Sequence, residues 1–130
     1  MVLLKHRIVS GIVMLILDFI WISSFMGPRY KTMIKKIQGS NMVVNFGFVF
    51  LAYAFMLLGL NVFVLPKINL KSKNPKDSFK YGFLFGIILF AVYDFTAAAL
   101  FKDWNFPLAV LDVLWGGILY FLTSYSIKLF

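Results

Sequence analysis

The sequence contains no cysteine, no glutamate and a single histidine. Without cysteine there is no disulfide, no thiol redox chemistry and no thiolate metal site, which excludes the quinone-linked thiol oxidoreductases of membranes. Without glutamate, the acidic side chains are five aspartates. A metal site built from Asp alone would suit a hard cation such as Mg²⁺ or Ca²⁺. We expect no metal, cofactor or catalytic residue, because the chain carries no recognised motif for them.

Polar residues are also scarce. Of the 130 residues, 62% are hydrophobic and 14% are charged, and the mean hydropathy is +0.89. Such a chain lacks the polar side chains that would cover a soluble globule. The composition therefore predicts an integral membrane protein, and the length fits a single domain over residues 1–130.

Four long apolar runs occupy about residues 8–26, 42–65, 81–101 and 107–127. Each approaches the roughly 20 residues that an α-helix needs to cross the hydrocarbon core. The first run follows Lys5 and Arg7, as in a secretory signal, but no small-residue cleavage site follows it, so we expect it to be retained. The predicted fold class is all-α, a four-helix transmembrane bundle.

Two of the connections have a distinctive character. After the first run, lysines alternate at helical spacing with Tyr30, Met33, Ile34 and Ile37. This amphipathic pattern predicts a short helix lying at the membrane interface between the first two spans. The link at 102–106 is so short that the last two spans must form an antiparallel hairpin.

The charge distribution predicts an orientation. With four spans both termini share a side, and that side would hold eight of the thirteen Lys and Arg residues. The positive-inside rule then places both termini in the cytoplasm. The net charge of +8 therefore reflects membrane topology, and no nucleic-acid partner is expected. The expected partners are membrane lipids, with a homo-oligomer or a membrane partner protein left open.

Three of the five aspartates, Asp18, Asp94 and Asp112, stand alone inside apolar runs. An ionisable group there costs a few kcal/mol or more, so it is a functional-site candidate by default. Counted from the span ends, the three lie roughly 12, 10 and 8 Å below the same, non-cytoplasmic interface. Glycines share the helical faces of Asp94 and Asp112, which predicts inward orientation. We expect a shared site in which at least one carboxyl group keeps a proton.

A local pattern repeats around two of these aspartates. Residues 17–21 and 111–115 both read L-D-x-[IL]-W, and the i, i+3 spacing places each tryptophan on the face of its aspartate. A carboxylate beside an indole ring suits an organic cation, or it can accept a hydrogen bond from the indole N–H. The predicted binding residues are Asp18, Asp94, Asp112, Trp21, Trp115 and Tyr93.

Several of these stretches resemble a known family. Residues 93–96 (YDFT), 104–107 (WNFP) and 111–116 (LDVLWG), with Asp18 and Trp21, look like a small family of predicted four-helix membrane proteins of unassigned function from bacteria and large DNA viruses. The most specific part is D…W-x-x-P…D-x-x-W-G across the last hairpin. The resemblance covers essentially the whole chain and implies four helices and an acidic motif, but no activity.

Three classes of function follow. The leading interpretation is a protein that binds or transports a proton, a cation or a cationic small molecule at the aspartates. The second is a non-catalytic accessory or structural membrane protein, whose aspartates only hydrogen-bond neighbouring helices through residues such as Tyr53, Asn61 or Tyr120. The third is an intramembrane enzyme that uses paired carboxyl groups as acid and base on a lipid or isoprenoid.

Overall fold

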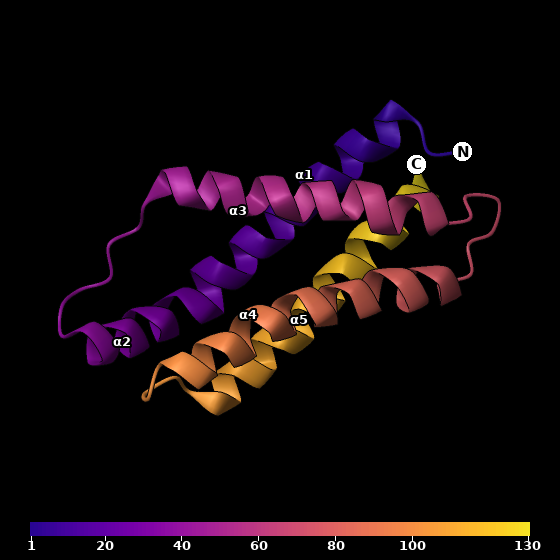
Figure 1. The fold of residues 1–130 in the computed structure, drawn as a ribbon. Coiled ribbons are helices and arrows are strands. Elements are labelled where there is room, and N and C mark those ends of the chain that lie inside the picture. Colours follow the sequence, from indigo (N-terminus) through magenta and orange to yellow (C-terminus); the bar gives the residue numbers. More distant parts are fainter.

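The computed structural model describes residues 1–130 and contains helices but no strands (Figure 1). Four continuous helical segments are long and apolar enough to cross a membrane: Leu4–Gln38, Phe46–Lys67, Ser78–Leu100 and Phe106–Leu129. These segments confirm the predicted all-α fold with four spans. Their ends differ from the predicted limits mainly in the first segment, which is much longer than one span requires.

The first segment is a single helix with one widened turn. Helix α1 (Leu4–Trp21) passes through a π-helical turn at Ile22–Met26 directly into α2 (Gly27–Gln38). The widened turn lies just before Pro28, which has no N–H to donate to an ordinary helical turn. Gly27 donates its N–H to the carbonyl of Ile22, and a Cβ at Gly27 would lie 2.5 Å from that oxygen.

The separate interfacial helix that the sequence suggested is therefore replaced by a continuation of α1. The apolar side of α2 packs against the α4–α5 end of the bundle: Met33 is buried with Ala97, Trp104 and Ala109. The helix ends at Gly39, whose φ of +75° is the left-handed conformation that favours glycine at a helix end. That α2 lies at a membrane surface stays a prediction.

Helix α3 (Phe46–Gly59) begins at Asn45, whose side chain accepts hydrogen bonds from the N–H groups of Gly47 and Phe48. It continues through a π-helical turn at Leu60–Val64 and a short 3-10 turn at Leu65–Lys67. Within α3 proper, Gly59 is the one buried residue, and most of its large apolar side chains are exposed. This composition suits a helix that is surrounded largely by lipid.

The last two spans form the tightest helix pair. A π-helical turn at Ser78–Phe83 leads into α4 (Leu84–Leu100), and α5 (Phe106–Ser126) returns antiparallel to it, ending in a 3-10 turn at Ile127–Leu129. A Cβ placed on Gly86 would lie 2.0 Å from the carbonyl oxygen of Gly116. Glycine is therefore required for this approach, as expected for small residues between membrane helices.

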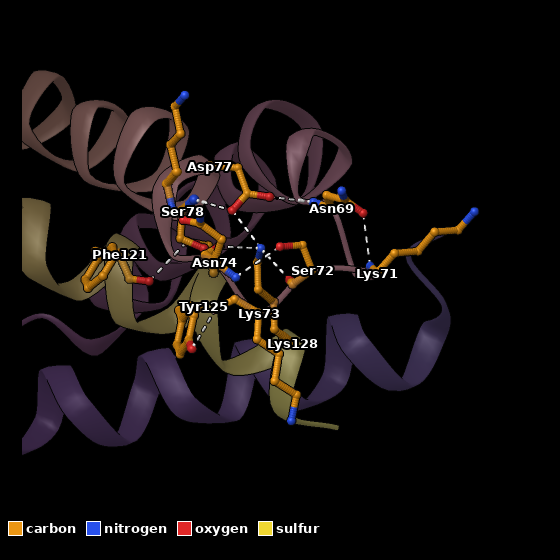
Figure 2. A network of polar contacts seen from close by, with 12 residues as sticks. Asn69, Lys71, Ser72, Lys73, Asn74, Asp77, Ser78, Phe121, Tyr125 and Lys128 are labelled. Atoms are coloured by element: carbon orange, nitrogen blue, oxygen red, sulfur yellow. Dashed lines mark hydrogen bonds and ion pairs between the residues drawn. The ribbon is translucent and has the colours of Figure 1, made fainter.

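Both chain termini lie at one end of the molecule, beside the loop that joins α3 to α4 (Figure 1). Figure 2 shows how this terminal end is closed. The ammonium of Lys128 contacts a carboxylate oxygen of Asp77 at 2.8 Å and donates to the carbonyls of Ser72 and Asn74 at 2.9 and 2.8 Å. Tyr125 donates its hydroxyl to the carbonyl of Lys73 at 3.0 Å.

Asp77 is held in its charged form by this network. Burial alone would raise its pKa, but the hydrogen bond from Lys128 and those from the N–H groups of Asn69 and Ser78 outweigh burial and lower the pKa of Asp77 below its usual value. We refer to Asp77, Lys128 and the carbonyls of Ser72 and Asn74 as the terminal clasp. The opposite end of the bundle carries α2 and the α4–α5 link.

Candidate functional site

A cavity of about 380 Å³ lies between the helices. Ten of its twelve lining residues are hydrophobic, and the other two are Asp18 and Asp112. The first helical segment, α3, α4 and α5 all contribute to its walls: Asp18, Trp21, Ile22, Met26, Tyr30, Ala52, Phe55, Met56, Leu89, Phe90, Tyr93 and Asp112. We call this space the aspartate cavity. Its composition is that of a small-molecule site, apolar with few polar groups.

Asp18 joins three helices at one wall of the cavity. Its side chain lies on α1 and is buried. The indole N–H of Trp115 on α5 donates to one carboxyl oxygen at 2.9 Å, and the hydroxyl of Tyr53 on α3 donates to the other. Both oxygens of Asp18 thus have a donor from the protein, and the carboxyl group is fixed in orientation.

Asp112 has a different partner. The hydroxyl of Tyr30 donates to one of its oxygens at 3.1 Å. Tyr30 belongs to α2, and our sequence interpretation placed it on an interfacial helix rather than in a site. The available signal was spacing: Met26, Tyr30 and Met33 continue, at intervals of four and three residues, the stripe on which Asp18 lies.

Asp94 lies behind Asp112 and does not line the cavity. Its side chain is fully buried, and neither of its carboxyl oxygens has a hydrogen-bond partner of ordinary geometry. The carboxyl group of Asp112 and the indole of Trp104 are the polar groups that face it. A buried, unpartnered carboxylate would be very costly in an apolar bundle, so this arrangement calls for a proton on the pair.

The tryptophans do not pair with the aspartates in their own five-residue patterns. Trp115 donates to Asp18 rather than to Asp112, and the rings of Trp21 and Trp115 stack with centroids 4.9 Å apart and planes 10° from parallel. Trp21 lines the cavity, while its indole N–H is buried and has no acceptor. The two patterns therefore meet each other across the bundle.

The structure thus brings four of the six predicted binding residues to the cavity wall: Asp18, Asp112, Trp21 and Tyr93. The other two, Trp115 and Asp94, stand behind the wall and contact Asp18 and Asp112 respectively. The site also includes Tyr30 and Tyr53, of which the sequence had suggested only Tyr53, as a hydrogen-bond partner between helices.

No protein cation balances these carboxyl groups. The two salt bridges of the chain, Lys36 with Asp103 and Lys128 with Asp77, both lie elsewhere. Both arginines of the chain bond to other groups: Arg29 stacks on the ring of Phe25 and donates to that residue's carbonyl, and Arg7 donates to the side-chain oxygen of Asn61. No group of three or more ligating side chains is placed to hold a metal ion. The site is acidic and apolar at once.

Fold and site together define an integral membrane protein with four apolar helices and buried carboxyl groups between them. Residues 3–127 match the family described as "Predicted membrane protein (DUF2177)", and the chain belongs to that family. Neither the search of curated proteins nor the search of solved structures found a match. The family description supports membrane residence and assigns no ligand or reaction.

Proposed function

We propose that this protein binds an organic cation with an apolar body, and that the aspartate cavity is the binding site. If the protein is a transporter, this cation is what it carries. The observation that carries the proposal is the composition of the cavity wall: two carboxyl groups without a protein cation, set among ten hydrophobic residues. A ligand that matches this wall has one positive centre and hydrocarbon or aromatic groups around it.

The polar part of the wall favours a positive centre. Asp18 and Asp112 supply negative charge, and the aromatic rings of Trp21, Tyr30 and Tyr93 line the same space. A cation gains from both features, because aromatic faces attract positive charge and do so more strongly when water is excluded. An anion would meet repulsion from both.

The apolar part of the wall argues against a bare inorganic ion as the ligand. A hard divalent cation needs six or more oxygen ligands, or retained water, and no cluster of three ligating side chains is present. The aspartates alone would allow three ligands: a proton, an inorganic cation or a cationic small molecule. Only the cationic small molecule would contact the hydrophobic residues of the wall as well as the carboxyl groups.

Access from the lipid side fits the same kind of ligand. Among the lining residues, Phe55 on α3 and Tyr93 on α4 are 66% and 55% exposed. Figure 1 shows α3 and α4 moving apart as they leave the loop that joins them. A hydrophobic cation concentrates in the bilayer and would reach the cavity between these two helices.

The test uses tetraphenylphosphonium as the probe and tetraphenylborate, which has the same shape and the opposite charge, as the control. Binding to the purified protein in detergent is followed by titration calorimetry. We expect saturable binding of the phosphonium alone. Asp18→Asn should weaken it at least about tenfold, since a desolvated charge partner is lost. Asp103→Asn, at the exposed pair outside the cavity, should leave it unchanged.

Equal binding of the two probes would contradict the proposal, because the site would then recognise shape and not charge. Saturable binding of neither would contradict it as well. A second candidate, the accessory protein, is favoured by a specific observation: the hydrogen bonds of Asp18 to Tyr53 and Trp115 tie three helices together. The stability measurements described in the Discussion separate the two.

A further inference from the structure

We infer that cation binding in the aspartate cavity releases a proton from the pair formed by Asp94 and Asp112, so that the protein exchanges one cation for one proton. This inference rests on the proposed function and adds a coupled ion to it. The geometry that points to it is a sequence of two carboxyl groups: Asp112 lines the cavity, and Asp94 lies directly behind it, sealed from solvent.

The two carboxyl groups of this pair have little else to bond. Asp112 accepts one hydrogen bond, from Tyr30, while both oxygens of Asp94 lack any partner of ordinary geometry. Two carboxyl groups side by side in an apolar setting do not both ionise, because the second charge would be placed next to the first. A proton held between them satisfies Asp94, which no other group does.

The remaining groups around the pair cannot take over this role. The titratable side chains that face it are Tyr30 on α2, Tyr93 on α4 and, through Asp112, Asp18 on α1, which in turn bonds Tyr53 on α3. The remaining facing group, Trp104 from the link between α4 and α5, does not titrate. All of these are acids or neutral aromatics, so positive charge enters the site only as protons or as ligand.

The exchange step balances in charge and atoms. In the empty site the proton forms an O–H bond with one carboxyl group of the pair. When a singly charged cation settles beside Asp112, that O–H bond breaks, its electron pair remains on the carboxylate, and the proton passes to water. One positive charge arrives and one leaves. The charge of the buried site is therefore the same before and after, which avoids the cost of an uncompensated charge in the membrane.

The experiment measures tetraphenylphosphonium binding to the whole protein across about pH 6 to about pH 9, the range that buried carboxyl groups reach. The probe is permanently charged and does not titrate. Calorimetry in two buffers of different ionisation enthalpy counts the protons released. We expect about one proton per phosphonium and an affinity that rises about tenfold per pH unit where the pair is protonated.

Asp94→Asn sharpens the test. The asparagine amide can donate an N–H to Asp112 but cannot exchange a proton, and Asp112 loses its like-charged neighbour. We expect proton release and the pH dependence of affinity to disappear together in this variant. Asp103→Asn should retain both. The wild-type proton count stands by itself should Asp94→Asn fail to fold.

The outcomes distinguish the two claims. Saturable phosphonium binding with no proton released and no dependence on pH would overturn the exchange and leave the proposed function in place. Unchanged proton release in a folded Asp94→Asn variant would also overturn it, by removing Asp94 from the step. Lack of saturable binding in the wild type would overturn the proposed function, and the exchange would fall with it.

Discussion

Asp77 in the terminal clasp and Asp94 in the bundle are both carboxyl groups largely withdrawn from solvent, with exposed fractions of 18% for the Asp77 side chain and 0% for Asp94. Their surroundings are opposite. Asp77 accepts hydrogen bonds from a lysine ammonium and two backbone N–H groups, whereas Asp94 faces a second aspartate and accepts no hydrogen bond of ordinary geometry. The negative charge of Asp77, at the terminal end of the molecule, has a lysine as its partner, whereas no cation of the protein faces Asp94 in the centre of the bundle.

The contrast separates two uses of a buried charge. A paired and fully hydrogen-bonded ion holds together the two segments that carry the pair. Removing one partner leaves the other buried without its counter-charge. An unpaired acidic group does not hold segments together in this way. Its burial among apolar residues is costly unless a ligand or a proton neutralises its charge. Each of the following changes tests one side of this comparison.

The largest effect is expected at the terminal clasp. Asp77→Ala leaves the Lys128 ammonium, whose side chain is 1% exposed, with carbonyl partners and no counter-charge. We expect the free energy of unfolding to fall by about 2 to 4 kcal/mol. Thermal or denaturant unfolding in detergent micelles measures it. The matched control is Lys36→Met, which breaks an exposed pair at 3.9 Å and should cost about 0 to 1 kcal/mol.

A double-mutant cycle isolates the pair itself. Lys128→Met combined with Asp77→Ala should recover part of the stability lost in Asp77→Ala, because no unpaired ammonium then remains. Purely additive losses would show that the two side chains do not stabilise each other. The claim that the clasp is held by a compensated charge pair would then be wrong.

Acid should weaken the clasp in a defined direction. The pKa of Asp77 is lowered in the folded protein, so its contribution is fully present above the pKa of an unfolded aspartate, about 3.9, and is lost as the pH falls toward the lowered folded value. We expect the unfolding temperature to decrease across this acidic window. In Asp77→Asn the part of the decrease that comes from Asp77 should be missing. If the unfolding temperature of this variant falls with pH as steeply as that of the wild type, Asp77 is not the group responsible.

The spans and the hairpin could be predicted from the sequence, but the partners inside the bundle could not. Apolar runs with at most one charge each define spans through length and transfer energy, which are local properties. Which tryptophan meets which aspartate depends on how far each helix is rotated about its axis. For this reason Trp115 was expected at Asp112, whereas the structure places it at Asp18.

The continuation of α1 into α2 escaped prediction for a different reason. Gly27 and Pro28 ordinarily indicate a helix end, and the lysines that follow indicate an interface. A single π-helical turn accommodates the missing N–H of Pro28 and lets the helix continue. That continuation carries Tyr30 to Asp112, so a backbone detail of one turn determines a contact in the site.

A smaller effect is expected where the bundle centre does have a hydrogen bond. Trp115→Phe keeps an aromatic ring against Trp21 and removes the N–H that reaches Asp18 at 2.9 Å. We expect a loss of about 0.5 to 1.5 kcal/mol in unfolding free energy. Trp21→Phe is the control, since its indole N–H has no acceptor to lose. Equal losses in the two variants would show that ring volume matters and the hydrogen bond does not.

The smallest effect is expected at Asp94, where the comparison is sharpest. Asp94→Leu removes a buried carboxyl group that accepts no hydrogen bond of ordinary geometry and shares only a proton with Asp112, so the unfolding temperature should stay the same or rise, in contrast to Asp77→Ala. Phosphonium-coupled proton release should be lost in the same variant. If the aspartates serve only to hold helices together, Asp94→Leu should instead lower stability by about 1 to 2 kcal/mol, the range for polar contacts between membrane helices. Unfolding curves of Asp94→Leu and Asp77→Ala, recorded in one detergent, therefore decide whether Asp94 stabilises the centre of the bundle as Asp77 stabilises its terminal end.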